Sequence, residues 1–264
     1  MTTLTDPARE LADVCANLAP QSEERGDNYL AKHFGVPAWS REFYQILFCI
    51  TDRADFLISV VADLDLDDDF KADAVSHIAG VKEAFSINGM SNAWKNFGAP
   101  RVGSQNAQPI KMLSALVRQK IAYPKLSDEE LDELVAEVDT LAGWLTDHQI
   151  KEQDFIRQAI LDGLSHFRFR LARLRWVGWG YTLESLRDVI GAYMALERGI
   201  QEASVDPVAK ALLKKVGAFV KEFYEKTKFA RDVTETGDFM LRAYGAVSLI
   251  AHGSHIAGLI SSQS

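Results

Sequence analysis

Residues Pro37–Leu66 read PAWSREFYQILFCITDRADFLISVVADLDL, and this pattern sets the expected fold class of the whole chain. Their apolar side chains recur every three or four positions, at Trp39, Phe43, Ile46, Ile50, Ala54, Leu57, Val61 and Leu64. That spacing places them on one face of an α-helix, which has about 3.6 residues per turn. Pro37 suits the first helical turn, because the N–H that proline lacks would have no partner there.

The same helical spacing continues on both sides of this stretch. Ser127 is followed three residues later by Glu130, a capping-box signature that marks the start of another helix. Asp206-Pro207 opens a further one. Weaker helical patterns cover residues 5–19, 23–34, 68–86, 109–122, 148–176, 183–203 and 236–261. Because no pair of alternating strands joined by a hairpin turn accompanies them, we predict an all-α fold, a single compact bundle of about nine or ten helices.

Composition agrees with an ordinary globular protein. The chain has 264 residues, of which 47 % are hydrophobic and 25 % charged, with a net charge of −8. A chain of this length buries enough surface to fold without metals or disulfides. Its two cysteines, Cys15 and Cys49, do not form a disulfide framework, and Met1–Arg9 shows no signal peptide. We therefore expect a single domain over residues 1–264, located in the cytoplasm.

One segment interrupts the helical patterns. Residues 88–108 read NGMSNAWKNFGAPRVGSQNAQ and are rich in Asn, Gly, Ser and Gln. This composition predicts an irregular polar segment, in which Trp94 and Phe97 anchor a short helical turn. Long irregular segments within a compact domain are uncommon and often functional.

Positive charge is concentrated in residues 84–127, called the basic segment below. It contains no Asp or Glu, and its cations are Lys95, Arg101, Lys111, Arg118, Lys120 and Lys125. Such asymmetry attracts an anionic ligand, a nucleic acid or an acidic protein. The alternative is that these cations pair with acids elsewhere in the fold. Lys111 and Arg118 fall on one helical row, so replacing both with alanine should weaken an anionic contact without unfolding the protein.

A second concentration of charge is His166–Trp176, HFRFRLARLRW. As one helix it would have two apolar faces, and its arginines, Arg168, Arg170, Arg173 and Arg175, would need carboxylates or a bound anion between helices. Asp162, His166 and Arg170 are spaced by four residues and would form one polar row in a contact between helices. This pattern fits either an anion pocket with a titratable imidazole or a lattice of salt bridges between helices.

The sequence does not match the catalytic and metal-binding motifs with which we compared it. The acidic run Asp63–Asp73 lacks the glycine and the final glutamate of a calcium loop, and helix capping by Asp67–Asp69 explains it more simply. His252 and His255 lack a third ligand in the sequence pattern, and no HExxH motif occurs. We therefore predict no metal site and assign neither catalytic residues nor a cofactor.

The C-terminal stretch Ala243–Ser264 has no Lys, Arg, Asp or Glu. Its 22 residues are long enough to span a bilayer, but they include many polar groups. Gly245, Gly253 and Ala257 form a small-residue surface that lets another helix approach closely. We expect a helix packed in the bundle or at a homo-oligomer interface rather than in a membrane.

Together these patterns predict a soluble helical interaction or regulatory protein, a subunit of a larger assembly that contacts an anionic partner through the basic segment. Two alternatives stay open. One is an enzyme or sensor that recognises a phosphate-bearing small molecule in the Arg/His/carboxylate pocket. The other is a nucleic-acid-binding protein that uses residues 84–127. The expected partner is another protein or a second copy of the chain.

Overall fold

Capping side chains fix where several of the longer helices begin in the computed structural model, which describes residues 4–150, 154–199 and 207–227. The carboxylate of Asp6 accepts a hydrogen bond from the Arg9 N–H at the start of the first helix. At the predicted capping box, the Ser127 hydroxyl accepts from the Glu130 N–H and the Glu130 carboxylate accepts from the Ser127 N–H. The helix start expected there is therefore confirmed.

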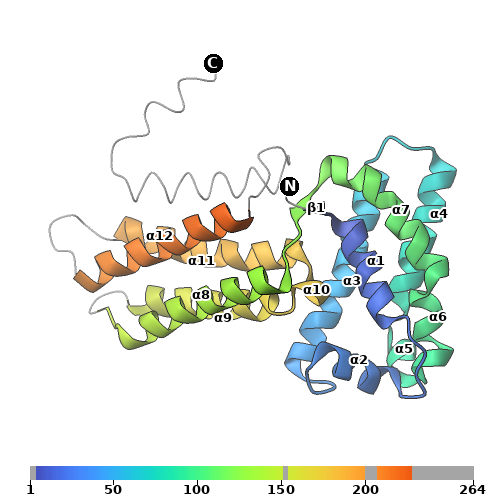
Figure 1. Cartoon of the computed structure of the whole chain (residues 1–264), viewed down its shortest axis with the longest axis horizontal. Coiled ribbons are helices and arrows are strands. Elements are labelled where there is room, and N and C mark those ends of the chain that lie inside the picture. The colour runs from blue at the N-terminus through green and yellow to red at the C-terminus, as the bar shows by residue number, and fades with distance from the viewer. Residues whose placement is uncertain (1–3, 151–153, 200–206, 228–264) are drawn as a thin grey trace. The chain divides into compact units, whose positions relative to one another are not determined.

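The described residues are predominantly helical (Figure 1). The helices are α1 (Pro7–Leu18), α2 (Gly26–Phe34), α3 (Arg41–Ala62), α4 (Asp68–Glu83), α5 (Ile87–Ser91), η1 (Trp94–Asn96), α6 (Gly98–Val102), α7 (Ser104–Lys120), α8 (Asp128–Asp147), α9 (Asp154–Leu171), α10 (Leu174–Val177), α11 (Trp179–Gly199) and α12 (Pro207–Thr227). Two short strands, β1 (Leu4–Thr5) and β2 (Tyr123–Pro124), pair with each other. The predicted all-α class is confirmed.

The chain divides into two compact units. The N-terminal unit consists of Leu4–Tyr123 together with Arg173–Tyr181. Of the described residues, the C-terminal unit contains 124–150, 154–172, 182–199 and 207–227. The single domain expected over residues 1–264 stays a prediction.

The N-terminal unit is built around α3. The inner face of α3 buries Phe43, Ile46, Ile50 and Leu57 completely, as the sequence predicted. In this unit α1 packs along α7, α4 packs against both α3 and α7, and α10 packs against α3. Trp94 is fully buried, and its indole N–H donates to the Leu18 carbonyl at 2.8 Å.

In the C-terminal unit, α8 packs against both α9 and α12. Leu145 of α8 is fully buried, as is Phe167 of α9, whose ring meets that of Phe223 edge-on at 5.3 Å. Of the helices in the described ranges, none is both long enough and apolar enough to cross a membrane.

Helix α3 begins at Arg41 rather than at Pro37. The Ser40 side chain caps it by accepting from the Phe43 N–H at 3.1 Å. Pro37 lies before the helix, and its carbonyl accepts from the Ser40 N–H at 3.3 Å, which closes a turn. The placement of Trp39 on the buried stripe was therefore wrong, because this residue lies in the turn and is 44 % exposed.

Residues 88–108 are more regular than expected. They form most of α5, then η1, α6 and the first turn of α7. Glycine permits this dense packing: a Cβ at Gly89 would lie 1.9 Å from the Ala84 carbonyl oxygen, and one at Gly98 would lie 2.1 Å from the Trp94 ring. The short helical turn expected at Trp94 is confirmed as η1, whereas a wholly irregular segment is not what the structure contains.

The helix predicted over residues 148–176 is also interrupted. Helix α9 ends at Leu171, Arg173 has non-helical torsions (φ −123°, ψ 25°), and α10 is only four residues long. Arg168 and Arg170 therefore belong to α9, while Arg173 and Arg175 belong to the N-terminal unit. The helix expected over 236–261 and the small-residue surface in 243–264 lie outside the described residues.

Candidate functional site

The cations of the basic segment mostly have partners within the N-terminal unit. The Lys95 ammonium lies 2.6 Å from the Glu23 carboxylate. The Arg101 guanidinium lies 3.5 Å from the centroid of the Phe97 ring and donates to the Phe97 carbonyl. The Lys120 ammonium reaches the Asp63 carbonyl at 3.5 Å. The side chains of Lys111 and Lys125 are exposed.

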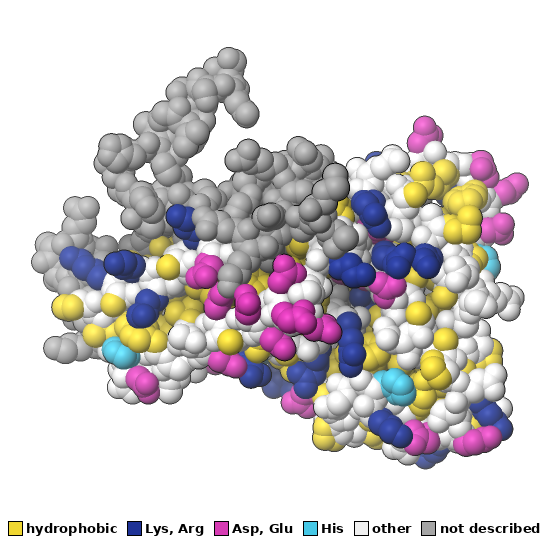
Figure 2. All heavy atoms as spheres, viewed as in Figure 1, with side chains coloured by type: hydrophobic (Ala, Val, Ile, Leu, Met, Phe, Trp, Pro, Cys, Tyr) yellow, Lys and Arg dark blue, Asp and Glu magenta, His cyan; other side chains and the backbone are white. Residues whose placement is uncertain are grey.

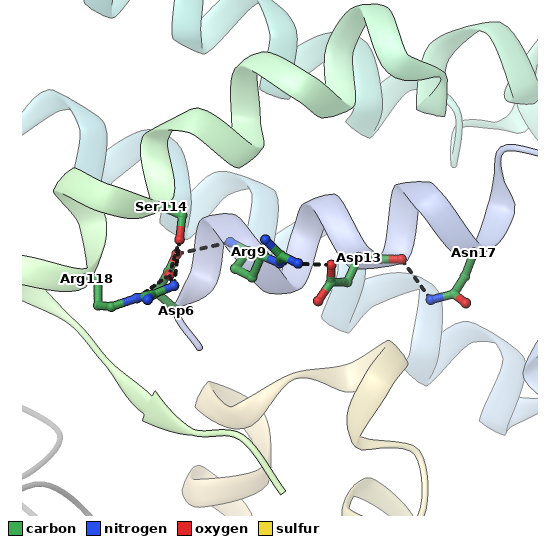
Figure 3. Close-up of polar contacts among 6 residues, drawn as sticks. All are labelled: Asp6, Arg9, Asp13, Asn17, Ser114 and Arg118. Carbon is green, nitrogen blue, oxygen red and sulfur yellow. Dashed lines mark hydrogen bonds and ion pairs between the residues drawn. The ribbon is translucent and has the colours of Figure 1, made fainter. Parts of the chain in front are cut away.

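Arg118 has a structural contact (Figure 3). Asp6 is fully buried at the start of α1, and its Oδ2 accepts hydrogen bonds from the Ser114 hydroxyl at 2.5 Å and from Arg118 Nη2 at 3.1 Å. Arg118 Nη2 also donates to the Ser114 hydroxyl at 3.0 Å. These bonds join α1 to α7. The pairing alternative therefore describes Arg118 better than a free anion-binding role.

Because of this contact, alanine substitutions of Arg118 and Lys111 should differ in their effect on stability. Arg118→Ala should lower the free energy of unfolding by about 1.5–3 kcal/mol, because Asp6 loses charge-assisted hydrogen bonds while staying buried. Lys111→Ala, the matched control on the same helix, should change it by about 0.5 kcal/mol or less. Urea denaturation of both variants measures the difference. Equal, small effects would show that the Asp6 contact contributes little.

The arginines of α9 contact the neighbouring helices of the C-terminal unit. Arg168 binds Asp139 of α8, with an Nη2–Oδ2 distance of 2.8 Å, and this hydrogen bonding lowers the pKa of Asp139. Arg170 lies 3.6 Å from the Glu184 carboxylate of α11. Both contacts are of the kind expected for a salt-bridge lattice.

The predicted row Asp162, His166 and Arg170 does lie on one helix, α9. Asp162 and His166 are exposed, however, and Asp162 accepts from Gln158 of the same helix at 3.0 Å. Only Arg170 of the row makes an ion pair with another helix among the described residues. In the N-terminal unit, the Arg175 guanidinium lies 4.9 Å from the centroid of the Trp176 ring.

A buried ion pair that the sequence did not reveal lies in the N-terminal unit. Arg53 is only 5 % exposed, and its Nη1 lies 3.6 Å from Oε2 of Glu10. Arg53 Nη2 donates to the Trp176 carbonyl at 2.6 Å, while Glu10 Oε1 accepts from the Trp179 N–H at 3.2 Å. The pair thus ties α1 and α3 to the segment Arg173–Tyr181.

Burial raises the pKa of Glu10 to about 7, against the opposing effects of Arg53 and of the Trp179 N–H. The surroundings are tightly filled. Gly178 has a φ of 83°, and a Cβ there would lie 2.7 Å from Arg53 Nη1. A cation at the position of Arg53, within an otherwise apolar helical stripe, is the sequence signal that marks such a pair. Its enclosure favours a structural role.

The outward side of α3 and the turn before it carry exposed aromatic rings, here called the aromatic face. Its members are Trp39, Tyr44, Phe48 and Phe56, which are 44, 40, 62 and 44 % exposed. The Trp39 and Tyr44 ring centroids are 6.0 Å apart, and those of Tyr44 and Phe48 are 6.3 Å apart and stacked. These contacts hold three rings side by side on the surface.

Trp39 has an unusual backbone conformation. Its φ is 63°, and no other non-glycine residue in the described ranges has a positive φ. Its indole N–H donates to Asp27 Oδ2 at 3.0 Å, and Asp27 is only 4 % exposed. A positive φ in a bulky residue is a genuine outlier that costs about 1–3 kcal/mol. The strained turn and the buried carboxylate together fix the position of this ring.

The groove between α8 and α12 has a volume of about 380 Å³. Leu141, Trp144 and Phe219 line its apolar part. The Lys215 ammonium lies over the Trp144 ring, 5.1 Å from its centroid, so the face of that ring already contacts a cation. We therefore interpret the groove as the seam between two packed helices.

The acidic run at the start of α4 behaves as expected for capping. Asp67 accepts a hydrogen bond from the Phe70 N–H at 2.8 Å, and Asp68 and Asp69 lie in the first turn. Within the part of the chain that the structure describes, no three His, Cys, Asp or Glu side chains are grouped so that they could hold a metal ion.

Two features of the N-terminal unit therefore stand out. The Glu10–Arg53 pair is enclosed, whereas the rings of the aromatic face are exposed. Comparison with protein-family models, with curated proteins and with solved structures finds no match to this chain.

Proposed function

We propose that this chain is a helical interaction protein that binds a protein partner through its aromatic face. Adjacent exposed apolar side chains commonly mark interaction sites on soluble proteins. Aromatic residues are enriched in protein interfaces and supply much of their binding energy. Trp39, Tyr44 and Phe48 meet both criteria, because they are exposed and contact one another.

The strained conformation of Trp39 is the observation that carries this proposal. A turn with a positive φ at this position ordinarily takes glycine, which adopts the conformation without cost. Trp39 instead combines strain with an exposed ring that Asp27 holds in place. Strain of this kind is typical of functional sites, where the side chain contributes to function rather than to stability.

The basic segment supports a contact with an anionic partner less well. Lys95 and Arg118 already pair with Glu23 and Asp6. Recognition of a nucleic acid through the same segment meets the same difficulty. Recognition of a phosphate-bearing small molecule meets it at α9, where Arg168 and Arg170 pair with carboxylates. The aromatic face is therefore the surface that we assign to the partner.

A random peptide library displayed on phage tests the proposal. Peptides selected on the full chain should bind Trp39→Gly and Phe48→Ser at least about tenfold more weakly, the loss typical of an interface hot spot. The free energy of unfolding of Trp39→Gly should lie within about 1 kcal/mol of the wild-type value, because relief of strain offsets the lost hydrogen bond. Binding is measured by fluorescence anisotropy and stability by urea denaturation.

Met112→Ser is the matched control, because Met112 is a 77 % exposed apolar residue on α7 rather than α3. The Met112→Ser variant should bind the selected peptides with the affinity of the wild type. Selection that enriches no peptide, or peptides that bind all three variants equally well, would refute the proposed role of the aromatic face.

A further inference from the structure

The aromatic face lies in a strongly acidic part of the chain. Residues 41–69 contain eight acids and two bases: Glu42, Asp52, Asp55, Asp63, Asp65, Asp67, Asp68, Asp69 and the bases Arg41 and Arg53. Arg41 is exposed at the start of α3. Arg53 points into the core and is only 5 % exposed. The exposed charge that this stretch itself contributes to the surface is therefore negative.

Asp52 shares one side of α3 with three of the rings. Tyr44, Phe48, Asp52 and Phe56 follow one another at intervals of four residues, so they form one row along the helix. Asp52 is exposed between two of the rings. Asp55 instead forms an ion pair with Lys82 of α4, whose ammonium lies 2.6 Å from its carboxylate.

The acidic surface continues past the end of this row. All five aspartates from Asp63 to Asp69 are exposed. Figure 2 shows acidic side chains around the turn that joins α3 to α4. A partner lying along α3 would thus meet aromatic rings first and then these five aspartates, beside which the Lys71 and Lys120 ammonium groups bind the Ala62 and Asp63 carbonyls.

We infer that the aromatic face binds a cationic amphipathic segment of a partner protein, in which Lys or Arg side chains alternate with apolar ones. Lysine and arginine are attracted to the faces of aromatic rings, and arginine pairs with carboxylates through two hydrogen bonds. The row from Tyr44 to Phe56 is about 18 Å long, which matches about three turns of a bound helix. The same negative field repels phosphate groups, and therefore nucleic acids and anionic membranes.

This inference rests on the proposed function and adds the chemistry of the partner. Two synthetic amphipathic peptides with identical leucine positions provide the probes, one with Lys and Arg on its polar face and one with Glu. The full chain should bind the cationic peptide, and the acidic peptide should bind at least about tenfold more weakly. Raising the salt concentration to about 1 M should remove most of this preference, because the screening length falls to about 3 Å.

Asp52→Asn tests the row directly, since the substitution removes one charge and keeps the side-chain shape. We expect the cationic peptide to bind this variant about three- to tenfold more weakly at low salt. Asp147→Asn, which removes an exposed carboxylate at the end of α8, is the matched control and should bind as the wild type does. Equal losses in both variants would mean general charge attraction and would overturn the inference.

The two proposals fail in different ways. If library peptides depend on Trp39 and Phe48 but carry no excess of Lys or Arg, the docking function stands and the cationic partner is refuted. If the cationic peptide binds Phe48→Ser as tightly as the wild type, its contact lies elsewhere and the inference is refuted. Binding of the chain to phosphatidylserine vesicles that Phe48→Ser abolishes would likewise refute it, because the aromatic face would then bind an anionic surface.

Discussion

Replacing Arg53 with methionine is expected to lower the free energy of unfolding by about 3–5 kcal/mol at pH 8, the usual cost of removing one partner of a buried ion pair. At that pH Glu10 of the wild type is mostly ionised, since its pKa is about 7 with Arg53 beside it, and loss of the cation would raise this pKa further. Methionine would keep much of the buried volume, but the Glu10 carboxyl would either stay charged without its cation or have to take up a proton. It would also remove the donor to the Trp176 carbonyl.

Arg9→Met is the matched control for this substitution. Arg9 forms an ion pair with Asp13, but the two side chains are 37 and 46 % exposed (Figure 3). Breaking such an exposed pair should cost about 0.5 kcal/mol. Chemical denaturation measures both variants, and a cost for Arg53→Met no greater than that for Arg9→Met would contradict the structural role of the buried pair.

Glu10 should also make stability depend on pH. The folded protein holds a proton on this carboxyl up to about pH 7, whereas the unfolded chain releases it near 4.5. Between these values the unfolded state binds fewer protons, so rising pH lowers the free energy of unfolding. The contribution present below pH 4.5 is lost by pH 7, a decline of roughly 3 kcal/mol for a carboxyl that is only 11 % exposed.

Glu10→Gln has no such proton to hold, so its stability should lack this decline. Urea denaturation at several pH values from 4 to 8 would compare it with the wild type. Glu23→Gln, which alters a carboxylate that is 80 % exposed, should keep the slope of the wild type. Parallel curves for the wild type and Glu10→Gln would show that Glu10 does not titrate in this range.

Local patterns in the sequence predicted the helices well, because their causes are local. The spacing of Phe43, Ile46 and Ile50 predicts the buried face of α3, and Ser127 with Glu130 predicts the start of α8. The start of α3 was misplaced for an equally local reason. Proline and serine both favour a helix start, and at this site the serine hydroxyl provides the cap while Pro37 closes the preceding turn.

The candidate sites were harder to predict, because their contacts join residues far apart in the chain. The positive charge of the basic segment is visible in the sequence, but the pairing of Arg118 with Asp6, 112 residues away, is not. The break after Leu171 escaped notice because HFRFRLARLRW has good helical spacing throughout. Trp39 was assigned to the core because the sequence pattern does not report a backbone torsion.

The N-terminal unit is assembled from two separate stretches of the chain, so it cannot be completed until the second stretch has been synthesised. Its first stretch ends at Tyr123, yet Trp176 and Trp179 belong to the second stretch, Arg173–Tyr181. A ribosome adds about 10 residues per second, so the 49 intervening residues, Pro124–Ala172, take about 5 s to make. Throughout that interval the emerging helices α1 and α3 lack the backbone groups that Arg53 and Glu10 bind in the finished protein. A fragment cut after Tyr123 would lack these backbone partners permanently.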